Sequence, residues 1–277
     1  MERHVARRML DRIGLWFAVF VLVSPAVFVF LWMVSLSLKS EIDNIEYPPI
    51  FVPTEPTLRN YIQVFEENRF GLYLLNSLIV TGGSTLFGLL VGVPAGYGIA
   101  RAKAYKLATV IMIARMTPAL SFLIPLFIAF QWIGLTGTLV PIVITHLVIT
   151  VPIVVWIMMG FFEGLPPELE EAALVDGATI WQAFRHVAMP LAKPGITVAT
   201  ILAFIFSWNN FVFAMVLAGR ETRTLPVAVN NMLTFEQISW GPLAAAALLV
   251  TLPVLLLTVV AQREIVAGLS SGGLKDG

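Results

Sequence analysis

Long apolar stretches dominate the chain, and each is long enough to form a membrane-spanning α-helix. Crossing the hydrocarbon core takes roughly 20 mostly apolar residues. Six stretches meet this requirement, and we expect transmembrane helices at residues 13–38, 72–100, 107–133, 138–162, 195–219 and 241–262. The alternation of polar and apolar residues that is typical of barrel strands does not occur in the sequence. The pattern therefore predicts an all-α membrane protein with six transmembrane helices in a single domain, residues 1–277.

Lysine and arginine gather in alternate connecting segments. The N-terminal segment and the loops 101–106 and 163–194 are rich in them, whereas the loops 39–71 and 220–240 carry few. Short loops rich in Lys and Arg stay on the cytoplasmic side of a membrane. Both termini and the loop 163–194 are therefore predicted to be cytoplasmic.

Composition supports a membrane protein and excludes several kinds of chemistry. The chain is 58% hydrophobic and 12% charged, whereas soluble domains are about 45–50% apolar and about 25% charged. The net charge is zero, so nothing indicates nucleic-acid binding. The absence of cysteine excludes disulfides and thiol nucleophiles, and the histidines His4, His146 and His186 are scattered, so no metal site is expected.

The loop 163–194 carries signals for two short helices. Its sequence is EGLPPELEEAALVDGATIWQAFRHVAMPLAKP. Two prolines can open the first helix, and Asp176-Gly177 is a turn signal because glycine adopts positive φ without strain. Thr179 and Gln182 form a capping box for the second helix. Pro190 and Pro194 are expected to end it, so the loop is predicted to be a cytoplasmic helix–turn–helix.

The first of these two helices has the surface of a docking element. Leu169, Ala172 and Ala173 fall on one face, which is small enough to enter a groove on a partner. The alternative is a helix lying on the membrane surface. Such helices favour Lys and Arg on their polar face, and this one is acidic.

The same loop resembles the EAA loop of ABC importer permeases. The residues that carry the resemblance are Glu171, Ala172, Ala173, Asp176, Gly177, Phe184 and Pro190. Asn60-Tyr61, Asn76-Ser77-Leu78, Trp208-Asn209 and the tail 262–269 are similar to the carbohydrate-uptake, MalG-type branch of that family. The chain is identified as a member, which implies a single permease domain with the type I importer fold, located in a bacterial or archaeal inner membrane.

The resemblance also implies partners and roles. The EAA residues would form the coupling helix that docks on a separate ATPase. The partners implied are an ATPase homodimer, a second permease that completes a heterodimer, and an extracytoplasmic solute-binding protein. A P-loop requires Gly-Lys followed by Ser or Thr, and the sequence contains no Gly-Lys pair. ATP and Mg are therefore expected on the partner ATPase, with neither a cofactor nor a catalytic residue in this chain. The Gly-rich tail 262–277 is expected to be too flexible to form a helix of its own, and the resemblance implies that it reaches the ATPase.

Polar residues inside the predicted spans are candidates for the substrate path, since burying them in lipid is costly. Asn209 and Asn210 can bind hydroxyls, and Trp208 can stack on a sugar ring; hydrogen bonding between helices is the alternative. His146 is also a candidate, with a helix–helix contact as the alternative. Arg115 suits a sulfonate, phosphate or carboxylate on the solute. Backbone carbonyls freed by Pro118, a carboxylate of the second permease, and snorkelling are its alternatives.

The function predicted is the permease subunit of an ATP-driven importer for a sugar or sugar-like solute. A self-contained secondary transporter is the alternative, but every Asp and Glu lies outside the predicted spans. Proton-coupled transporters usually carry acids within the membrane. An intramembrane enzyme would need a histidine near serine or carboxylates. His146 is the only histidine in a predicted span, and no acidic partner for it lies in any of these spans.

Overall fold

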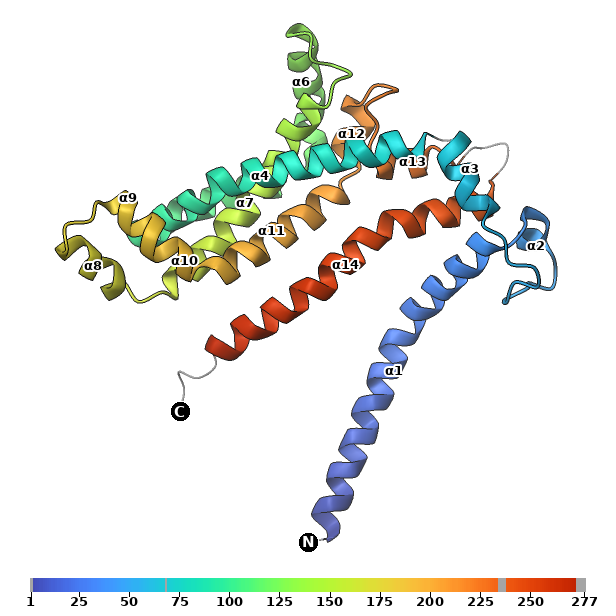
Figure 1. The fold of residues 1–277 in the computed structure, drawn as a ribbon, viewed down its shortest axis with the longest axis horizontal. Coiled ribbons are helices and arrows are strands. Elements are labelled where there is room, and N and C mark those ends of the chain that lie inside the picture. Colours follow the sequence, from blue (N-terminus) through green and yellow to red (C-terminus); the bar gives the residue numbers. More distant parts are fainter. Residues whose placement is uncertain (1, 68, 234–237, 273–277) are drawn as a thin grey trace. The chain divides into compact units, whose positions relative to one another are not determined.

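The computed structural model describes residues 2–67, 69–233 and 238–272 (Figure 1). In chain order the elements are α1 (Glu2–Leu38), α2 (Glu41–Ile45), α3 (Arg59–Glu67), α4 (Phe70–Ala102), α5 (Tyr105–Met116), α6 (Ala119–Trp132), α7 (Val140–Glu163), α8 (Glu168–Val175), α9 (Ile180–Ala183), the π-helical turn η1 (Phe184–Ala188), α10 (Met189–Leu191), α11 (Lys193–Trp208), α12 (Val212–Leu217), α13 (Leu225–Asn230) and α14 (Trp240–Gly272). They divide into two compact units. The first comprises residues 1–69 with 231–249, and the second comprises residues 70–230 with 250–277.

The predicted all-α membrane class is confirmed. Among the residues that the structure describes, four helical segments are long and apolar enough to cross a membrane: Gly14–Leu38, Phe70–Ala102, Val140–Glu163 and Trp240–Val259. Two bent helix pairs also pass this test. Tyr105–Met116 and Leu120–Trp132 meet at 85°, and Ile180–Leu191 and Lys193–Trp208 meet at 76°. Counting each pair as one span gives up to six. The single permease domain expected from the sequence stays a prediction.

Two predicted spans are interrupted in the structure. The third breaks at Thr117, because a residue that precedes a proline is pushed into extended backbone and Thr117 has ψ 128°. The fifth breaks after Trp208, so Asn209 and Asn210 lie between α11 and α12 rather than inside a continuous helix.

One expectation about a helix end is wrong, and one predicted span is longer than expected. Pro190 does not end the second loop helix, since the chain stays helical to Leu191. The preceding turn is π-helical, with Met189 N donating to Phe184 O, and such a wider turn relieves the clash between a proline ring and the turn before it. The tail from Gln262 to Gly272 forms no helix of its own but continues α14 past the predicted end of the span, because propagation from a long helix needs no new nucleus. Residues 273–277 lie outside the described part of the chain.

The second unit is built on a close contact between α4 and α7, with α11 packed on both (Figure 1). Gly88, Gly92 and Gly96 follow one another at intervals of four on α4. A Cβ atom at these positions would lie 2.8 Å from Thr150 Oγ1, 2.7 Å from Val154 Cβ and 2.9 Å from Met158 Cβ, respectively. Small residues at this spacing let two helix backbones approach closely, and these three glycines lie where α4 meets α7.

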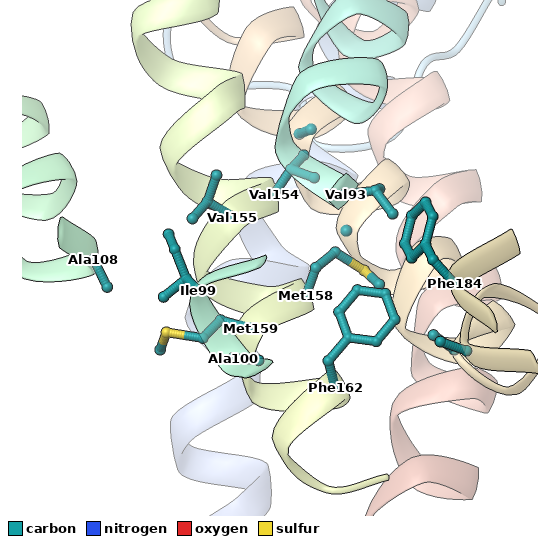
Figure 2. Packing of buried hydrophobic residues seen from close by; sticks show 14 residues of the cluster. Val93, Ile99, Ala100, Ala108, Val154, Val155, Met158, Met159, Phe162 and Phe184 are labelled. Carbon is teal, nitrogen blue, oxygen red and sulfur yellow. The ribbon is translucent and has the colours of Figure 1, made fainter. Parts of the chain in front are cut away.

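A buried apolar cluster joins the ends of α4 and α7 to the loop helices. Figure 2 shows Val93 of α4, Met158 and Phe162 of α7 and Phe184 of η1 in this cluster. Phe184 is only 3% exposed. The loop 163–194 is therefore anchored on the bundle by an aromatic side chain as well as by the chain itself.

At its other end, the same unit ties a loop onto the start of α4. Asn76 Nδ2 donates to Glu221 O at 2.8 Å and to Arg223 O at 3.0 Å. Leu225 N donates to Ser77 Oγ at 2.7 Å. Asn76 and Ser77 therefore tie the start of α4 to the loop after α12, which is held in place before α13 begins.

The first unit is organised around two buried polar side chains. Asn60 of α3 donates to Ser37 O at 2.9 Å and to Lys39 O at 2.8 Å. Lys39, which is 1% exposed, donates from Nζ to Ile50 O at 2.7 Å. The carboxylate of Glu41 accepts from the N–H groups of Trp240 and Gly241 and so satisfies two donors at the start of α14.

Candidate coupling loop and translocation residues

The turn and the helix cap of the loop 163–194 form as its sequence predicts. Gly177 takes φ +90° between the two helices, a conformation that favours glycine. The capping box is present: Gln182 N donates to Thr179 Oγ1 at 3.2 Å, and Thr179 N donates to Gln182 Oε1 at 2.7 Å. The helix–turn–helix is therefore encoded locally.

This loop presents apolar side chains outward and turns one charge inward. Val175 is 87% exposed, Ile180 70% and Trp181 60%, and Leu169 and Leu174 are also exposed. By contrast, Glu170 is buried. An acid turned inward below an apolar outer surface is the reverse of the usual arrangement for a loop helix in water.

The predicted coupling residues fall into two groups. Glu171, Ala172, Asp176 and Gly177 are exposed, and Ala173 is half-buried. Phe184 is buried, with its ring centroid 4.7 Å from that of Tyr97. Pro190 is exposed beside the groove lined by Trp181, Arg185, Met189, Lys193 and Ile196. The exposed group is available to a partner, whereas Phe184 anchors the loop.

Glu170 was not singled out by the sequence analysis, although it is the best-bound side chain of α8. Tyr97 Oη donates to Glu170 Oε2 at 2.6 Å, and Arg101 Nε donates to Glu170 Oε1 at 3.0 Å. Arg101 Nη2 also donates to Glu170 Oε1, and Arg101 Nη1 donates to Phe162 O at 2.9 Å. The sequence held one signal for this contact: Arg101 directly follows the predicted span 72–100, and a guanidinium at that place needs an acceptor.

The polar centre of the second unit is built from hydroxyls and one imidazole. His146 Nδ1 and Ser207 Oγ are 2.8 Å apart, and Ser207 Oγ is 2.8 Å from Ser84 Oγ. Thr150 Oγ1 donates to Ser84 O at 2.9 Å. His146 is 1% exposed, and its Nε2 has no hydrogen-bond partner among the residues that the structure describes. The histidine thus links α7 to α11 and keeps one free nitrogen.

The other predicted path residues of α11 make local contacts. Trp208 is 1% exposed, and its indole N–H donates to Val250 O at 3.0 Å. Asn209 Nδ2 donates to Ile205 O at 3.0 Å, and Asn210 Oδ1 accepts from Phe213 N at 3.3 Å. These amides satisfy backbone groups at the break between α11 and α12. Their role toward a substrate stays a prediction.

Arg115 lies in the last turn of α5, just before the break at Thr117. Its guanidinium carbon is 5.4 Å from the ring centroid of Phe206 on α11. Within the described ranges, no carboxylate forms an ion pair with it. The arginine is thus held against the exposed aromatic face of Phe206, whose neighbour in the chain, Ser207, is buried and bonds His146.

Comparison with known proteins gives consistent matches. The chain is 35% identical over 262 residues to the trehalose transport system permease protein SugB of Mycobacterium tuberculosis, covering 92% of this chain and 94% of that protein. It is 33% identical to the sulfoquinovosyl glycerol transport system permease protein SmoH of Agrobacterium fabrum, covering 92% and 91%. In structure it resembles a chain of a bacterial ABC transporter that imports the acidic polysaccharide alginate, with a TM-score of 0.75 and 22% identity, covering 93% and 97%.

The family model for the inner membrane component of binding-protein-dependent transport systems matches residues 85–269, which is more than half of the chain. The match includes the loop 163–194, His146, Thr150 and Ser207 of the polar centre, and the helices from α5 to α13. The chain therefore belongs to the family of binding-protein-dependent ABC transport permeases, and it is a multi-pass inner membrane component that supplies the path rather than the ATPase.

Proposed function

We propose that this permease imports a sugar or a sugar-like solute, and that a separate ATPase drives it through the loop 163–194. The relatives named for trehalose and for sulfoquinovosyl glycerol support the solute class. The observation that carries the coupling role is the outer surface of α8 and α9, with its uncovered apolar side chains above the inward-turned Glu170.

Burial of that surface would supply binding energy. A large apolar side chain gains about 1.5–3 kcal/mol when it moves from water into a protein groove. Leu169, Val175, Ile180 and Trp181 are all exposed and lie on neighbouring short helices. The exposed Glu171, Ala172, Asp176 and Gly177 lie on the same loop, as expected for residues that meet the ATPase. Phe184 is buried and anchors the loop on the span helices, and Pro190 lines the groove beside Trp181.

The proposed assembly contains this chain, a second permease, two copies of an ATPase and an extracytoplasmic solute-binding protein. A similar solved structure, of a bacterial alginate ABC transporter in complex with a periplasmic protein that holds an alginate pentasaccharide, supports the binding protein. ATP and Mg belong to the ATPase, because this sequence has no Gly-Lys pair for a P-loop.

In this assignment the loop 163–194 and both termini face the cytoplasm. The ion pair between Arg101 and Glu170 supports a common side for the loops 101–106 and 163–194, as the distribution of basic residues predicts. Thr222 donates to Gly137 O at 3.1 Å, which supports a common, external side for the segments around them.

Cross-linking tests the coupling role directly. The chain contains no cysteine, so Val175→Cys introduces a single thiol at an exposed position of α8. In the assembled transporter we expect this thiol to cross-link to the ATPase, whereas Thr222→Cys on the opposite loop does not. Equal cross-linking at both sites, or solute import by this chain in liposomes without the ATPase, would contradict the proposal.

For the substrate path we propose Arg115, His146, Trp208, Asn209 and Asn210. Arg115 would bind an anionic group of the solute. A charge at the centre of a span costs at least about 2.5 kcal/mol, and charged residues within spans usually mark a substrate pathway. His146 offers a free nitrogen. Asn209 and Asn210 lie where the helix is interrupted, and the buried Trp208 holds that interruption against α14.

Arg115 can be tested with paired solutes. Import of a sulfonated sugar and of its unsulfonated parent would be compared in Arg115→Gln and Arg115→Lys transporters. We expect the glutamine variant to lose import of the sulfonated sugar selectively, and the lysine variant to keep part of it. Equal loss for both sugars would assign Arg115 to assembly instead.

A further inference from the structure

Glu170, Arg101 and Tyr97 form a junction between the coupling loop and two span helices. We propose that this junction, and Glu170 in particular, passes the movement of α8 to the cytoplasmic ends of α4 and α7. Glu170 is then a positioning residue for coupling. This inference rests on the proposed coupling role of the loop 163–194.

One guanidinium connects three elements. Arg101 at the end of α4 donates from Nε to Glu170 Oε1 of α8 at 3.0 Å and from Nη1 to Phe162 O of α7 at 2.9 Å. Tyr97, one turn earlier on α4, donates to the second carboxylate oxygen at 2.6 Å. Both oxygens of Glu170 are therefore bound to α4, and the same arginine is bound to α7.

The junction is the polar connection between α8 and the spans. Within the described chain, no other side chain of α8 donates or accepts a hydrogen bond with a span helix. The neighbouring acids Glu168 and Glu171 are exposed. The apolar connection passes through η1, where Phe184 lies 4.7 Å from the Tyr97 ring, and Tyr97 lies 5.2 Å from the Phe162 ring.

The chemistry of the junction makes it stiff. Hydrogen bonds to ionised groups are roughly twice as strong as neutral ones. Two donors of the guanidinium hold Glu170 Oε1 and the Tyr97 hydroxyl holds Oε2, so the carboxylate is fixed in direction as well as in distance. A buried carboxylate that loses its partner is strongly destabilised. When α8 shifts, Glu170 therefore pulls Arg101 with it, because sliding past it would leave a buried charge unpaired.

The test measures ATP hydrolysed per solute imported, in proteoliposomes that contain the whole transporter. Glu170→Gln keeps the shape of the side chain and removes its charge. We expect it to assemble and to hydrolyse ATP, while the solute imported per ATP falls roughly five- to tenfold, within the usual range of coupling between sites. Glu168→Gln, an exposed acid in the same helix turn, is the control and should keep the wild-type ratio.

The Val175→Cys cross-link separates the possible failures. If the thiol cross-links to the ATPase in the Glu170→Gln background and the ratio is that of the wild type, the junction proposal is overturned and docking stands. If the thiol does not cross-link even with Glu170 present, the coupling role of the loop falls and this inference falls with it.

A second variant tests the junction in the case that the Glu170→Gln transporter does not assemble. Tyr97→Phe keeps the ring that packs on Phe162 and Phe184, and removes only the hydroxyl bound to Glu170. In that case we expect an intermediate fall in the solute imported per ATP. A wild-type ratio in Tyr97→Phe would then overturn the proposal.

Discussion

Adding one methyl group to Gly92 should separate α4 from α7 and destabilise the second unit. In Gly92→Ala the new Cβ would lie 2.7 Å from Val154 Cβ and 3.3 Å from Val151 O. Neither atom is the free end of a flexible side chain, because one is attached to the backbone and the other belongs to it. The contact can therefore be relieved only when the two helices move apart.

The magnitude follows from two opposing effects. Forcing an extra methyl into a close-packed interface costs about 1–3 kcal/mol. Replacing glycine by alanine inside a helix returns about 0.8–1 kcal/mol. Gly98→Ala on the same helix gains the second effect without the first, since nothing lies within 4 Å of its new Cβ. Subtracting one variant from the other isolates the cost of the close contact.

The assay is thermal unfolding of the purified transporter, followed for this chain. A loss of 1 kcal/mol corresponds to roughly 2–4 °C in a domain of this size. We expect Gly92→Ala to unfold at a lower temperature than Gly98→Ala by roughly 2–12 °C over the range of costs given above. Gly82→Ala, which also has open space around it, is the second control. Unfolding of Gly92→Ala at the temperature of Gly98→Ala would refute the close approach of α4 and α7.

Three further predictions address other parts of the chain. Gly177→Val should abolish import while the spans stay folded, because a β-branched residue is strained at φ +90°. Gly177→Asn, which tolerates positive φ better, should keep more activity. Equal import by both variants would contradict the turn assignment. Ser207→Ala should cost about 1–3 kcal/mol of stability, since His146 Nδ1 and Ser84 Oγ both lose a partner, whereas Thr258→Val, which loses only a bond to its own helix, should cost less. Burial lowers the pKa of Lys39 from its ordinary value of 10.5. As the pH approaches that value the unfolded chain holds more protons than the folded chain, so the free energy of unfolding should increase with pH there. Lys39→Met should flatten this rise, and an unchanged pH profile of unfolding would contradict it.

Sequence alone determined the features that depend on neighbours a few residues away. The apolar stretches fixed the class of the fold, since only lipid can solvate surfaces of that length and composition. The capping box of Thr179 and Gln182 and the positive φ of Gly177 followed from local backbone chemistry. The EAA spacing identified the family, and the family model confirms it.

Sequence pattern also gave partial answers where a long-range contact decided the outcome. Of the seven glycines and prolines between Gly82 and Gly98, a Cβ would be blocked by α7 at Gly88, Gly92 and Gly96. Periodicity could mark α4 as able to pack closely, but it could not say which face meets α7. Likewise, the break after Trp208 was not visible in the apolar pattern, because Asn209 and Asn210 are stabilised by bonds that form only once the helix has ended.

Tertiary structure decided which groups are brought together from distant segments. Three acids lie in α8 with nearly identical local surroundings, and only the approach of Arg101 and Tyr97, about 70 residues earlier in the chain, selects Glu170 as the buried one. Asn76 finds its carbonyl partners 145 and 147 residues away. Such pairings depend on how whole helices pack. A buried polar group bonds to the partner that this packing supplies, because burying it without a hydrogen bond costs free energy.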